Sequence, residues 1–232
     1  MKRIVQAGLG ALGFELRRKR PLEFAIGDLR FAADPCSVGE TPQGERTADG
    51  AARLIRERSL TGLRVLDVCC GVGIIGLLLH HRLGAEIVPR VGFVDLNVFN
   101  LNSLRRTLSG NGLHDGFDVW LSDGLAGVPD GERFDLIVSN PPHFLVDDFA
   151  AAPLSPETLG TYDEDWRFHR EFYAVCDRHL TERGEVWFLE NGAGANEGDL
   201  LPFVEANPAL RYRGSAQEPL VPGFFWMFTG RA

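Results

Sequence analysis

The chain has 232 residues, 44% of them hydrophobic, and a formal net charge of −8. This length and composition are typical of one α/β domain with a full core and at most a modest extension. Residues 1–20 carry six basic groups against one acid, so the rest of the chain sums to −13. So acidic a body disfavours general nucleic-acid binding, which depends on neutralising phosphates.

No apolar run approaches the ~20 residues that a membrane-spanning helix needs. The longest run is VGIIGLLL at 72–79, and the basic segment 1–20 reads as an amphipathic helix rather than a signal peptide. The four cysteines show neither a CxxC pair nor metal-ligand spacing: Cys36, Cys69, Cys70 and Cys176. We therefore expect reduced thiols, no bound metal and a cytoplasmic protein.

In chain order, residues 21–50 read as irregular with a short hairpin at 23–33, followed by a helix at 47–58. Buried strands then alternate with helices. The strands are expected at 63–68, 91–95, 117–121, 135–139 and 184–191, and the helices at 74–83, 98–112 and 165–180. The segments LRYRG (210–214) and GFFWMFTG (223–230) read as a terminal strand pair joined by a turn that contains proline.

This alternation predicts an α/β fold with a parallel sheet and right-handed crossovers. We divide the chain into an N-terminal helical or irregular extension at 1–60, a possible lid over a substrate, and a main domain at 61–232. In such sheets ligands bind beyond the carboxyl ends of the strands. The loops after residues 68, 95, 121 and 139 are therefore expected to form the site.

A glycine-rich loop, DVCCGVGIIG, follows the first main-domain strand. Gly71, Gly73 and Gly76 satisfy GxGxxG, a spacing that allows a tight turn and close approach of a nucleotide, or simply a close-packed turn without a ligand. Asp95 ends the next strand 24 residues after Gly71, where a carboxylate can accept from ribose hydroxyls or cap a helix. Asn97 is a second candidate for the helix cap.

Two further acidic residues indicate which class of nucleotide-like ligand the loop would bind. Asp67 lies inside the strand before the glycine loop, where it would repel a pyrophosphate but suit a sulfonium amino acid with its ammonium group. Asp123, in LSDG, is placed to accept from an adenine amino group, with a turn aspartate, which is common, as the alternative. Together with Asp95, these acids favour a ligand that is a nucleoside bearing a cationic group over a dinucleotide.

The segments DVCCGVG, VGFVDLN, SDGL and FDLIVSNPPHF resemble successive motifs of the class I S-adenosylmethionine-dependent methyltransferases, over roughly residues 60–190. The resemblance implies a Rossmann-like, doubly wound sheet of seven mostly parallel strands with an antiparallel C-terminal strand, and S-adenosylmethionine as cofactor. The cofactor-binding residues it implies are Asp67, Cys69, Gly71, Gly73, Asp95, Leu96, Asp123, Gly124 and Asn140. Cys69 and Cys70 replace residues that are usually small or glycine, and Cys70 should crowd the loop a little.

The stretch SNPPHF at 139–144 resembles the Asn-Pro-Pro-aromatic motif of the amino-methylating branch of that family. The Asn140 side-chain oxygen and the Pro141 carbonyl can each accept one N–H of an amide or aryl amine, which frees its lone pair and stabilises the positive charge that develops on it. Pro141 and Pro142 fix the backbone direction. A strand that merely ends in a turn is the alternative.

His143 departs from the motif, which usually has Tyr or Phe at this position. An imidazole can stack on a planar substrate, form hydrogen bonds or take a proton, so His143 is a candidate catalytic residue, with a structural role equally open. Phe144 is a candidate substrate-binding wall or a core residue.

Residues 145–165 hold six acids and neither Lys nor Arg. This acidic rim favours a neutral or cationic substrate, although a solvated loop explains it equally well. We therefore expect an N-methyltransferase that acts on a small molecule or a protein side chain, with an RNA nucleobase as the alternative. A nicotinamide-dependent oxidoreductase, a non-catalytic nucleoside-binding module, and a carbon or oxygen methyltransferase are the other classes considered.

Overall fold

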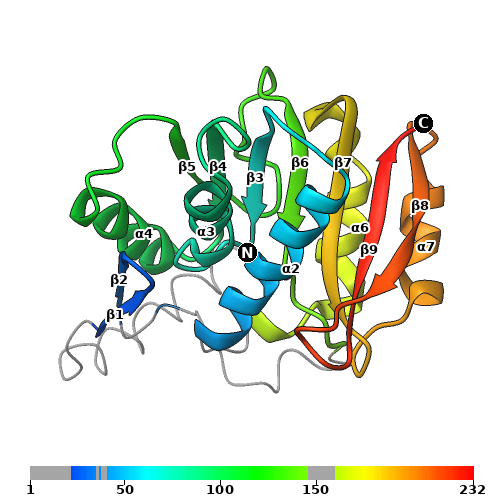
Figure 1. Ribbon diagram of the computed structural model, residues 1–232. Helices are drawn as coiled ribbons and strands as arrows, with labels where there is room; N and C mark the ends of the chain where they lie inside the picture. The colour runs from blue at the N-terminus through cyan, green and yellow to red at the C-terminus, as the bar shows by residue number, and fades with distance from the viewer. Residues whose placement is uncertain (1–21, 35–36, 38–40, 146–159) are drawn as a thin grey trace.

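The computed structural model describes residues 22–34, 37, 41–145 and 160–232 (Figure 1). Several sequence-based expectations lie outside these ranges: the amphipathic helix at 1–20, Cys36, and three acids of the rim, Asp147, Asp148 and Glu157. Within the described ranges, none of the helices combines the length and the apolarity needed to cross a lipid bilayer.

The fold is built on a mixed seven-stranded sheet. Its strands are β3 (Arg64–Val68), β4 (Arg90–Asp95), β5 (Phe117–Leu121), β6 (Phe134–Ser139), β7 (Leu180–Asn191), β8 (Leu210–Gln217) and β9 (Phe224–Arg231), in the order β5-β4-β3-β6-β7-β9-β8. Pairing is parallel from β5 to β7, and β9 runs antiparallel to both β7 and β8. The predicted fold class, including the antiparallel C-terminal strand, is confirmed.

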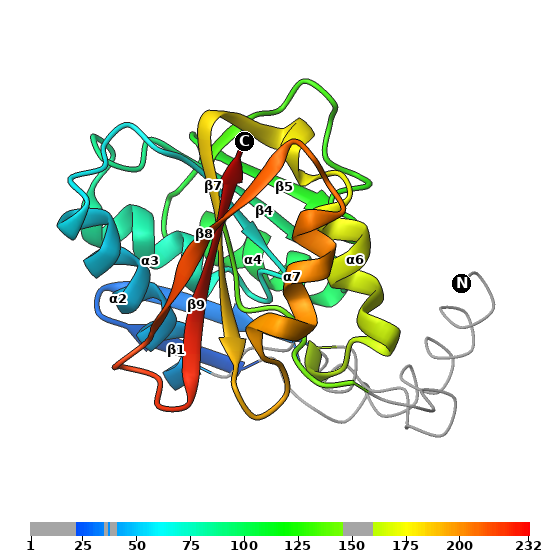
Figure 2. The same ribbon diagram turned by 90° about the vertical axis from the view of Figure 1, so that its right-hand side faces the viewer.

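Helices cover both faces of this sheet (Figure 2). One face carries α2 (Thr41–Glu57), α3 (Ile74–Leu83) and α4 (Val98–Gly110), and the other carries α6 (Arg167–Tyr173) and α7 (Glu197–Glu205). The central strand shows why both faces are covered. Val65 of β3 packs in one apolar core and its neighbour Leu66 in the other, because successive side chains of a strand point to opposite faces.

The hairpin expected at 23–33 is present as β1 (Leu22–Ile26) and β2 (Leu29–Ala33). It lies along α4, where the Ala32 N–H donates to the Thr107 hydroxyl at 2.9 Å and the Arg30 N–H donates to the Asn111 side chain at 2.9 Å. Phe31 is 1% exposed and packs in the same core as the sheet. The described part of residues 1–60 therefore shares the core of the main domain.

Helix boundaries differ from the sequence-based expectation in two places. Helix α2 begins at Thr41 rather than near residue 47, because a proline at position 42 falls in the first turn, where its missing N–H has no helical partner to lose. Helix α7 was not predicted, although its sequence signal exists: Asn196 and Asp199 form a capping box at its start.

The single helix expected at 165–180 is broken. A 3-10 turn at Glu164–Trp166 leads into α6, and a second 3-10 turn at Cys176–His179 leads directly into β7 at Leu180. After α6 the helix is interrupted at Val175, whose φ is −134°. Before α6, Asp165 and Trp166 have left-handed φ angles of 50° and 51°. Such angles are unfavourable for residues other than glycine, so tertiary contacts hold this entry to α6 in place.

Candidate functional site

The loops that follow β3, β4, β5 and β6 meet at one edge of the sheet, as parallel strands require. The Cys70 N–H donates to the Val94 carbonyl at 3.0 Å, which ties the β3 loop to β4. The Ser122 N–H donates to the Asp95 carbonyl at 3.1 Å, and the Ser139 hydroxyl donates to the Val68 carbonyl at 2.6 Å. All four loops predicted to form the site are therefore neighbours.

The glycine loop after β3 is a series of left-handed turns. The φ angles are 56° at Cys69, 56° at Gly71 and 84° at Gly73, so three of five successive residues adopt conformations that favour glycine. Cys69, and not Cys70, is thus the cysteine that the loop strains. Burial raises the pKa of the Cys69 and Cys70 thiols well above their usual value, which keeps both protonated.

Gly76 is required where α3 crosses the sheet. A Cβ at this position would lie 2.7 Å from the Phe93 ring and 2.8 Å from a Val91 methyl group. Both distances are shorter than real contacts, so any side chain at position 76 would push α3 away from β4. The third glycine of the motif therefore sets the distance between helix and sheet.

Asp67 is fully buried at the base of this loop. Its Oδ2 accepts the Gly76 N–H at 2.8 Å, while Oδ1 has no hydrogen-bond partner within the described part of the chain. Burial raises the pKa of Asp67 to about 7, the Gly76 N–H opposes that rise, and the nearby Asp95 adds to it. A buried carboxylate with one vacant oxygen is well suited to a cation.

Asp95 holds the loop from the next strand. Its Oδ2 accepts the Gly71 N–H at 2.8 Å and its Oδ1 accepts the Asn97 N–H at 2.7 Å, yet burial still raises its pKa to about 6. Asn97 is the N-cap of α4, accepting the Phe99 N–H at 3.0 Å, as predicted. Leu96 between them is 50% exposed, an apolar side chain at the edge where a nucleoside would lie.

Asp123 is held by a partner that the sequence did not indicate. The Arg167 guanidinium of α6 donates to both of its carboxylate oxygens, at 3.0 and 3.3 Å. A carboxylate has further lone pairs, so this ion pair leaves room for one more donor. Gly124 follows with a φ of 53°, a left-handed conformation that favours glycine.

These groups fit the expected cofactor. A vacant oxygen on a buried acid suits the ammonium or sulfonium group, two acids at strand ends suit hydroxyl and amino donors, and Leu96 offers an apolar surface to an adenine or ribose. The fit rests on the unpaired Asp67 Oδ1 rather than on the glycine spacing, which by itself is common to many nucleotide-binding folds.

The Asn-Pro-Pro stretch follows β6 directly. Pro141 and Pro142 are buried, and Asn140 is half-buried at the sheet edge. The Asn140 side-chain oxygen lies 3.1 Å from His143 Nε2 and 3.4 Å from Gln43 Nε2 of α2. Two side chains thus hold the carboxamide, and both contact its oxygen, the atom expected to accept from a substrate.

His143 lies behind Asn140 rather than at the surface. It is 6% exposed, its Nδ1 lies 3.2 Å from Glu190 Oε2, and its ring meets Phe224 edge-on with centroids 5.5 Å apart. Phe144 is half-buried and meets the exposed Tyr162 edge-on at 6.3 Å. The structure brings Asn140 and His143 together, with His143 buried and Phe144 half-buried beside Tyr162.

Several members of the site were missed: Gln43, Asp163, Arg167, His169 and Glu190. Glu190 was the most accessible to sequence reasoning, because it is an acid within GEVWFLEN, a run that reads as a buried strand. An ionisable group in such a run requires partners and marks a candidate site. Its partners are set by how α6 packs against β7, and no local pattern in the sequence reveals that packing.

Residues 45–151 match the family model described as Methyltransferase small domain. The chain is 35% identical over 127 residues to the ribosomal RNA small subunit methyltransferase C of Pseudomonas aeruginosa (strain UCBPP-PA14), which covers 55% of this chain and 35% of that protein. It is 25% identical over 167 residues to the release factor glutamine methyltransferase of Clostridium botulinum, covering 69% and 53%. The chain thus spans about a third of the length of the first of these relatives.

Solved structures with the same fold include a 16S rRNA guanine methyltransferase of T. Thermophilus in complex with AdoMet and guanosine. It has a TM-score of 0.63 at 20% identity over 92% of this chain and 50% of that one. An S-adenosylmethionine-dependent methyltransferase from Clostridium acetobutylicum has a TM-score of 0.57 at 12% identity, covering 81% and 91%. At these identities the two structures show a shared fold.

Proposed function

We propose that this chain, which carries a class I S-adenosylmethionine-dependent methyltransferase domain, methylates the exocyclic amino nitrogen of a purine in RNA, most specifically guanine. The observation that carries the proposal is the Asn140 carboxamide, half-buried at the end of β6 and anchored by His143 and Gln43. The relatives named for ribosomal RNA methylation, and the related structure that holds guanosine, favour an RNA base as the acceptor.

The chemistry of the acceptor explains the choice of residues. The amino nitrogen of guanine has its lone pair delocalised into the ring, and an acceptor on each N–H localises it for attack. The Asn140 oxygen and the Pro141 carbonyl supply these two acceptors, and they stabilise the positive charge that grows on nitrogen. S-adenosylmethionine, when bound, supplies an electrophilic methyl group, so position and orientation provide much of the rate without a strong base.

Cofactor binding is assigned to the loops after β3, β4 and β5. Asp67 would hold the cationic end through its vacant oxygen, Asp95 the ribose, and Asp123 the adenine amino group, with Leu96 against an apolar face. The glycine loop, from Cys69 through Gly73, brings backbone close to these groups. The methyl acceptor would then lie on the Asn140 side of the same edge.

The acidic rim argued for a small molecule or a protein side chain, and the structure weakens that argument. Asp163 is 3% exposed and lies 2.7 Å from His169, so its carboxylate is paired inside the fold rather than exposed to a substrate. Among the described acids of the rim, Glu164 and Asp165 are exposed. Reading a single base requires few phosphate contacts, so an acidic body is compatible with an RNA substrate that binds with weak salt dependence.

A protein amide is the second candidate. The chain is similar over 167 residues to a release factor glutamine methyltransferase. A glutamine side chain presents the same delocalised N–H₂ group as guanine, so the same two acceptors suit it. The two candidates differ in the macromolecule that delivers the nitrogen and not in the chemistry at Asn140.

The test uses the full chain with methyl-labelled S-adenosylmethionine. Small-subunit ribosomal RNA transcribed in vitro, which carries no methyl groups, is one substrate, and a release factor is the other. We expect label in the RNA that nuclease digestion recovers as a methylated guanine nucleoside, and we expect Asn140→Ala to abolish it. Label that only protease releases would select the protein amide. A chain that binds S-adenosylhomocysteine but labels neither substrate would overturn the proposal.

A further inference from the structure

Helix α6 reaches the cofactor half of the site through Arg167. The Arg167 guanidinium donates to both carboxylate oxygens of Asp123, at 3.0 and 3.3 Å, although the two residues lie 44 positions apart in the chain. In the proposed cofactor site, Asp123 accepts from the adenine amino group. A planar guanidinium that contacts both oxygens fixes the rotation of the carboxylate, whereas a contact to one oxygen leaves that rotation free.

The start of α6 also packs against the loop that follows β5. A Cβ on Gly124 would lie 3.9 Å from the Phe168 ring, an ordinary contact distance, so the helix and the loop are adjacent. Leu125 of the same loop is 4% exposed and shares an apolar core with Trp166 and Phe168. Arg167 therefore lies between two residues that are packed in the core, while its own side chain is 34% exposed beside the site.

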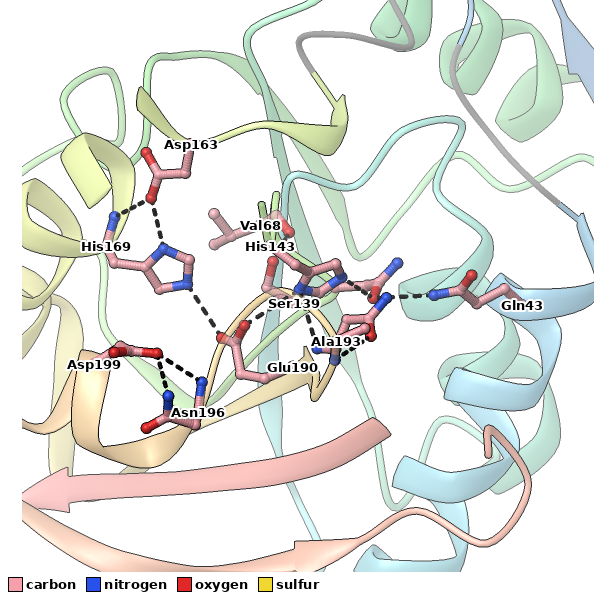
Figure 3. Close-up of polar contacts among 12 residues, drawn as sticks. Gln43, Val68, Ser139, His143, Asp163, His169, Glu190, Ala193, Asn196 and Asp199 are labelled. Atoms are coloured by element: carbon pink, nitrogen blue, oxygen red, sulfur yellow. Dashed lines mark hydrogen bonds and ion pairs between the residues drawn. The ribbon is translucent and has the colours of Figure 1, made fainter. Parts of the chain in front are cut away.

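Buried polar contacts hold this helix start against the sheet (Figure 3). The Asp163 carboxylate accepts the Phe168 N–H at 2.8 Å and the His169 N–H at 3.2 Å. Asp163 Oδ2 also lies 2.7 Å from His169 Nδ1, and His169 Nε2 lies 3.1 Å from Glu190 of β7. Asp163, His169 and Glu190 are each 3% exposed or less. The first turn of α6 is thus tied to β7 by side chains inside the fold.

These buried contacts are between charged groups. Burial by itself would lower the pKa of His169, but the carboxylates of Glu190 and Asp163 raise it to about 9. Burial by itself would raise the pKa of Glu190, but the His169 and His143 rings lower it to about 2. At neutral pH His169 is therefore a cation and Glu190 a carboxylate. Separating such partners would leave an unpaired buried charge, so the start of α6 has little freedom to move.

The backbone between these contacts and Arg167 is strained. Asp165 and Trp166 have φ angles of 50° and 51°, and neither residue is glycine. A left-handed conformation of this kind costs free energy and persists where the surrounding structure imposes it, often beside a functional site. Here it joins Asp163, which is paired inside the fold, to Arg167, the first residue of α6 and paired at the site.

We infer that Arg167 is a positioning residue for adenine recognition that acts through Asp123. By contacting both oxygens, it holds the carboxylate with a remaining lone pair directed at the adenine amino group. The inference rests on the proposed function, because that function assigns adenine to the loop after β5. The side chains of the pair are 34% and 26% exposed, so its consequence lies in ligand selectivity rather than in stability.

A second ion pair of Arg167 supplies the matched control. The guanidinium also contacts Glu171 at 2.9 Å, one helical turn further along α6, and that side chain is 61% exposed. Glu171→Gln removes this contact and leaves both contacts with Asp123 in place. Arg167→Met removes all of them while keeping a side chain of similar length.

The test compares two ligands by calorimetry: S-adenosylhomocysteine and its analogue with hydrogen in place of the adenine amino group. The ratio of their dissociation constants measures recognition of that amino group alone. We expect the wild type to bind the analogue about 10-fold more weakly or worse, because the analogue leaves the Asp123 lone pair unsatisfied. The ratio should fall below about threefold in Arg167→Met, and in Glu171→Gln it should stay within about twofold of the wild-type value.

Two further variants show whether Arg167 acts through Asp123. Arg167→Lys keeps the charge but loses the planar fork, and should give a ratio between those of the wild type and Arg167→Met. In Asp123→Ala the ratio should already be low, and adding Arg167→Met should lower it no further. If Arg167→Met fails to fold in a urea titration, Arg167→Lys decides in its place.

The outcomes separate this inference from the proposed function. A wild-type ratio near one would overturn the inference, and so would a wild-type ratio retained in Arg167→Met or, in its place, in Arg167→Lys. A wild type that binds neither ligand would overturn the cofactor site and the inference together. A wild type that distinguishes the two ligands but labels neither RNA nor a release factor would overturn only the proposed function.

Discussion

The proposed cofactor and acceptor halves of the candidate site are built from different kinds of contact. On the cofactor side, Asp67 and Asp95 accept backbone N–H groups of the glycine loop, so side chains hold the main chain in an unusual shape. On the acceptor side, Asn140 and His143 are held by other side chains, from α2 and β7, 97 and 47 residues away. In the first half the contacts maintain a backbone conformation, and in the second half they maintain the positions of side chains.

This difference predicts which measured property a substitution in each half should change. Backbone shape tolerates few side chains, so changes on the cofactor side should appear in stability and in affinity for S-adenosylmethionine. The side chains on the acceptor side decide which atoms the substrate meets, so changes there should appear chiefly in turnover. Variants at matched positions can separate the two expectations.

Asn140→Ala should have the largest effect. It removes an acceptor that matters most as charge develops on nitrogen, so kcat should fall about 100- to 1000-fold. The dissociation constant for S-adenosylhomocysteine, measured by calorimetry, should stay within about twofold if that ligand draws its affinity from the other loops.

The control for this variant is Asn196→Ala, which removes the amide that caps α7. It should cost about 1 kcal/mol of stability and leave kcat unchanged. If Asn140→Ala instead weakened S-adenosylhomocysteine binding as much as it lowered kcat, Asn140 would belong to the cofactor half and the comparison would fail.

Asp67 should make cofactor affinity depend on pH. Its pKa of about 7 in the free protein means that the carboxyl is protonated at pH 6 and must lose that proton to face a cation. Affinity for S-adenosylmethionine should therefore rise with pH and level off above 7, by up to about tenfold per pH unit below that point. Titrations at pH 6, 7 and 8 would measure it.

Asp67→Asn should abolish most of this dependence and weaken binding at pH 8. It should also flatten the pH dependence of stability of the free protein. A raised pKa stabilises the fold fully below the usual value of 3.8, and that contribution is lost as pH rises through 7. Asp95, with a pKa of about 6, adds a smaller effect of the same sign that the variant retains. Affinity that stayed pH-dependent in Asp67→Asn would assign the ionisation elsewhere.

The cofactor half was largely predictable because its partners follow a fixed spacing along strand–loop–helix units. The strands, the glycine loop, Asp95 at the end of β4 and the Asn97 cap all follow from local pattern, and the structure shows them. The acceptor half was predictable only at Asn140 and its two prolines. Glu190 and His169 become neighbours only when β7 and the short α6 pack together, and the start of α6 after Asp165 rests on left-handed backbone that no propensity predicts.

Gly76→Ala tests the cofactor half by adding one methyl group, without changing charge or hydrogen bonding. The added methyl group would meet Phe93 and Val91 at less than 3.0 Å, so α3 must shift, at a cost of about 1–3 kcal/mol of unfolding free energy. Gly110→Ala, at the end of α4 with open space around it, is the matched control and should be neutral or stabilising by up to about 1 kcal/mol. Urea denaturation measures both, and equal effects would mean that the close packing at Gly76 has no energetic consequence.

The smallest expected effect isolates the backbone at Cys69. Replacing the cysteine also removes a side chain that packs against the core on the α6 face, so Cys69→Ala serves as the reference for that loss. At an ordinary position glycine is less stable than alanine by roughly 0.5–1 kcal/mol. At a φ of 56° the order should reverse. The free energy of unfolding of Cys69→Gly, measured with denaturant, should be about 1 kcal/mol higher than that of Cys69→Ala. If alanine were the more stable of the two, the left-handed conformation would carry no strain, and the loop would owe its shape to Asp95 and Asp67 alone.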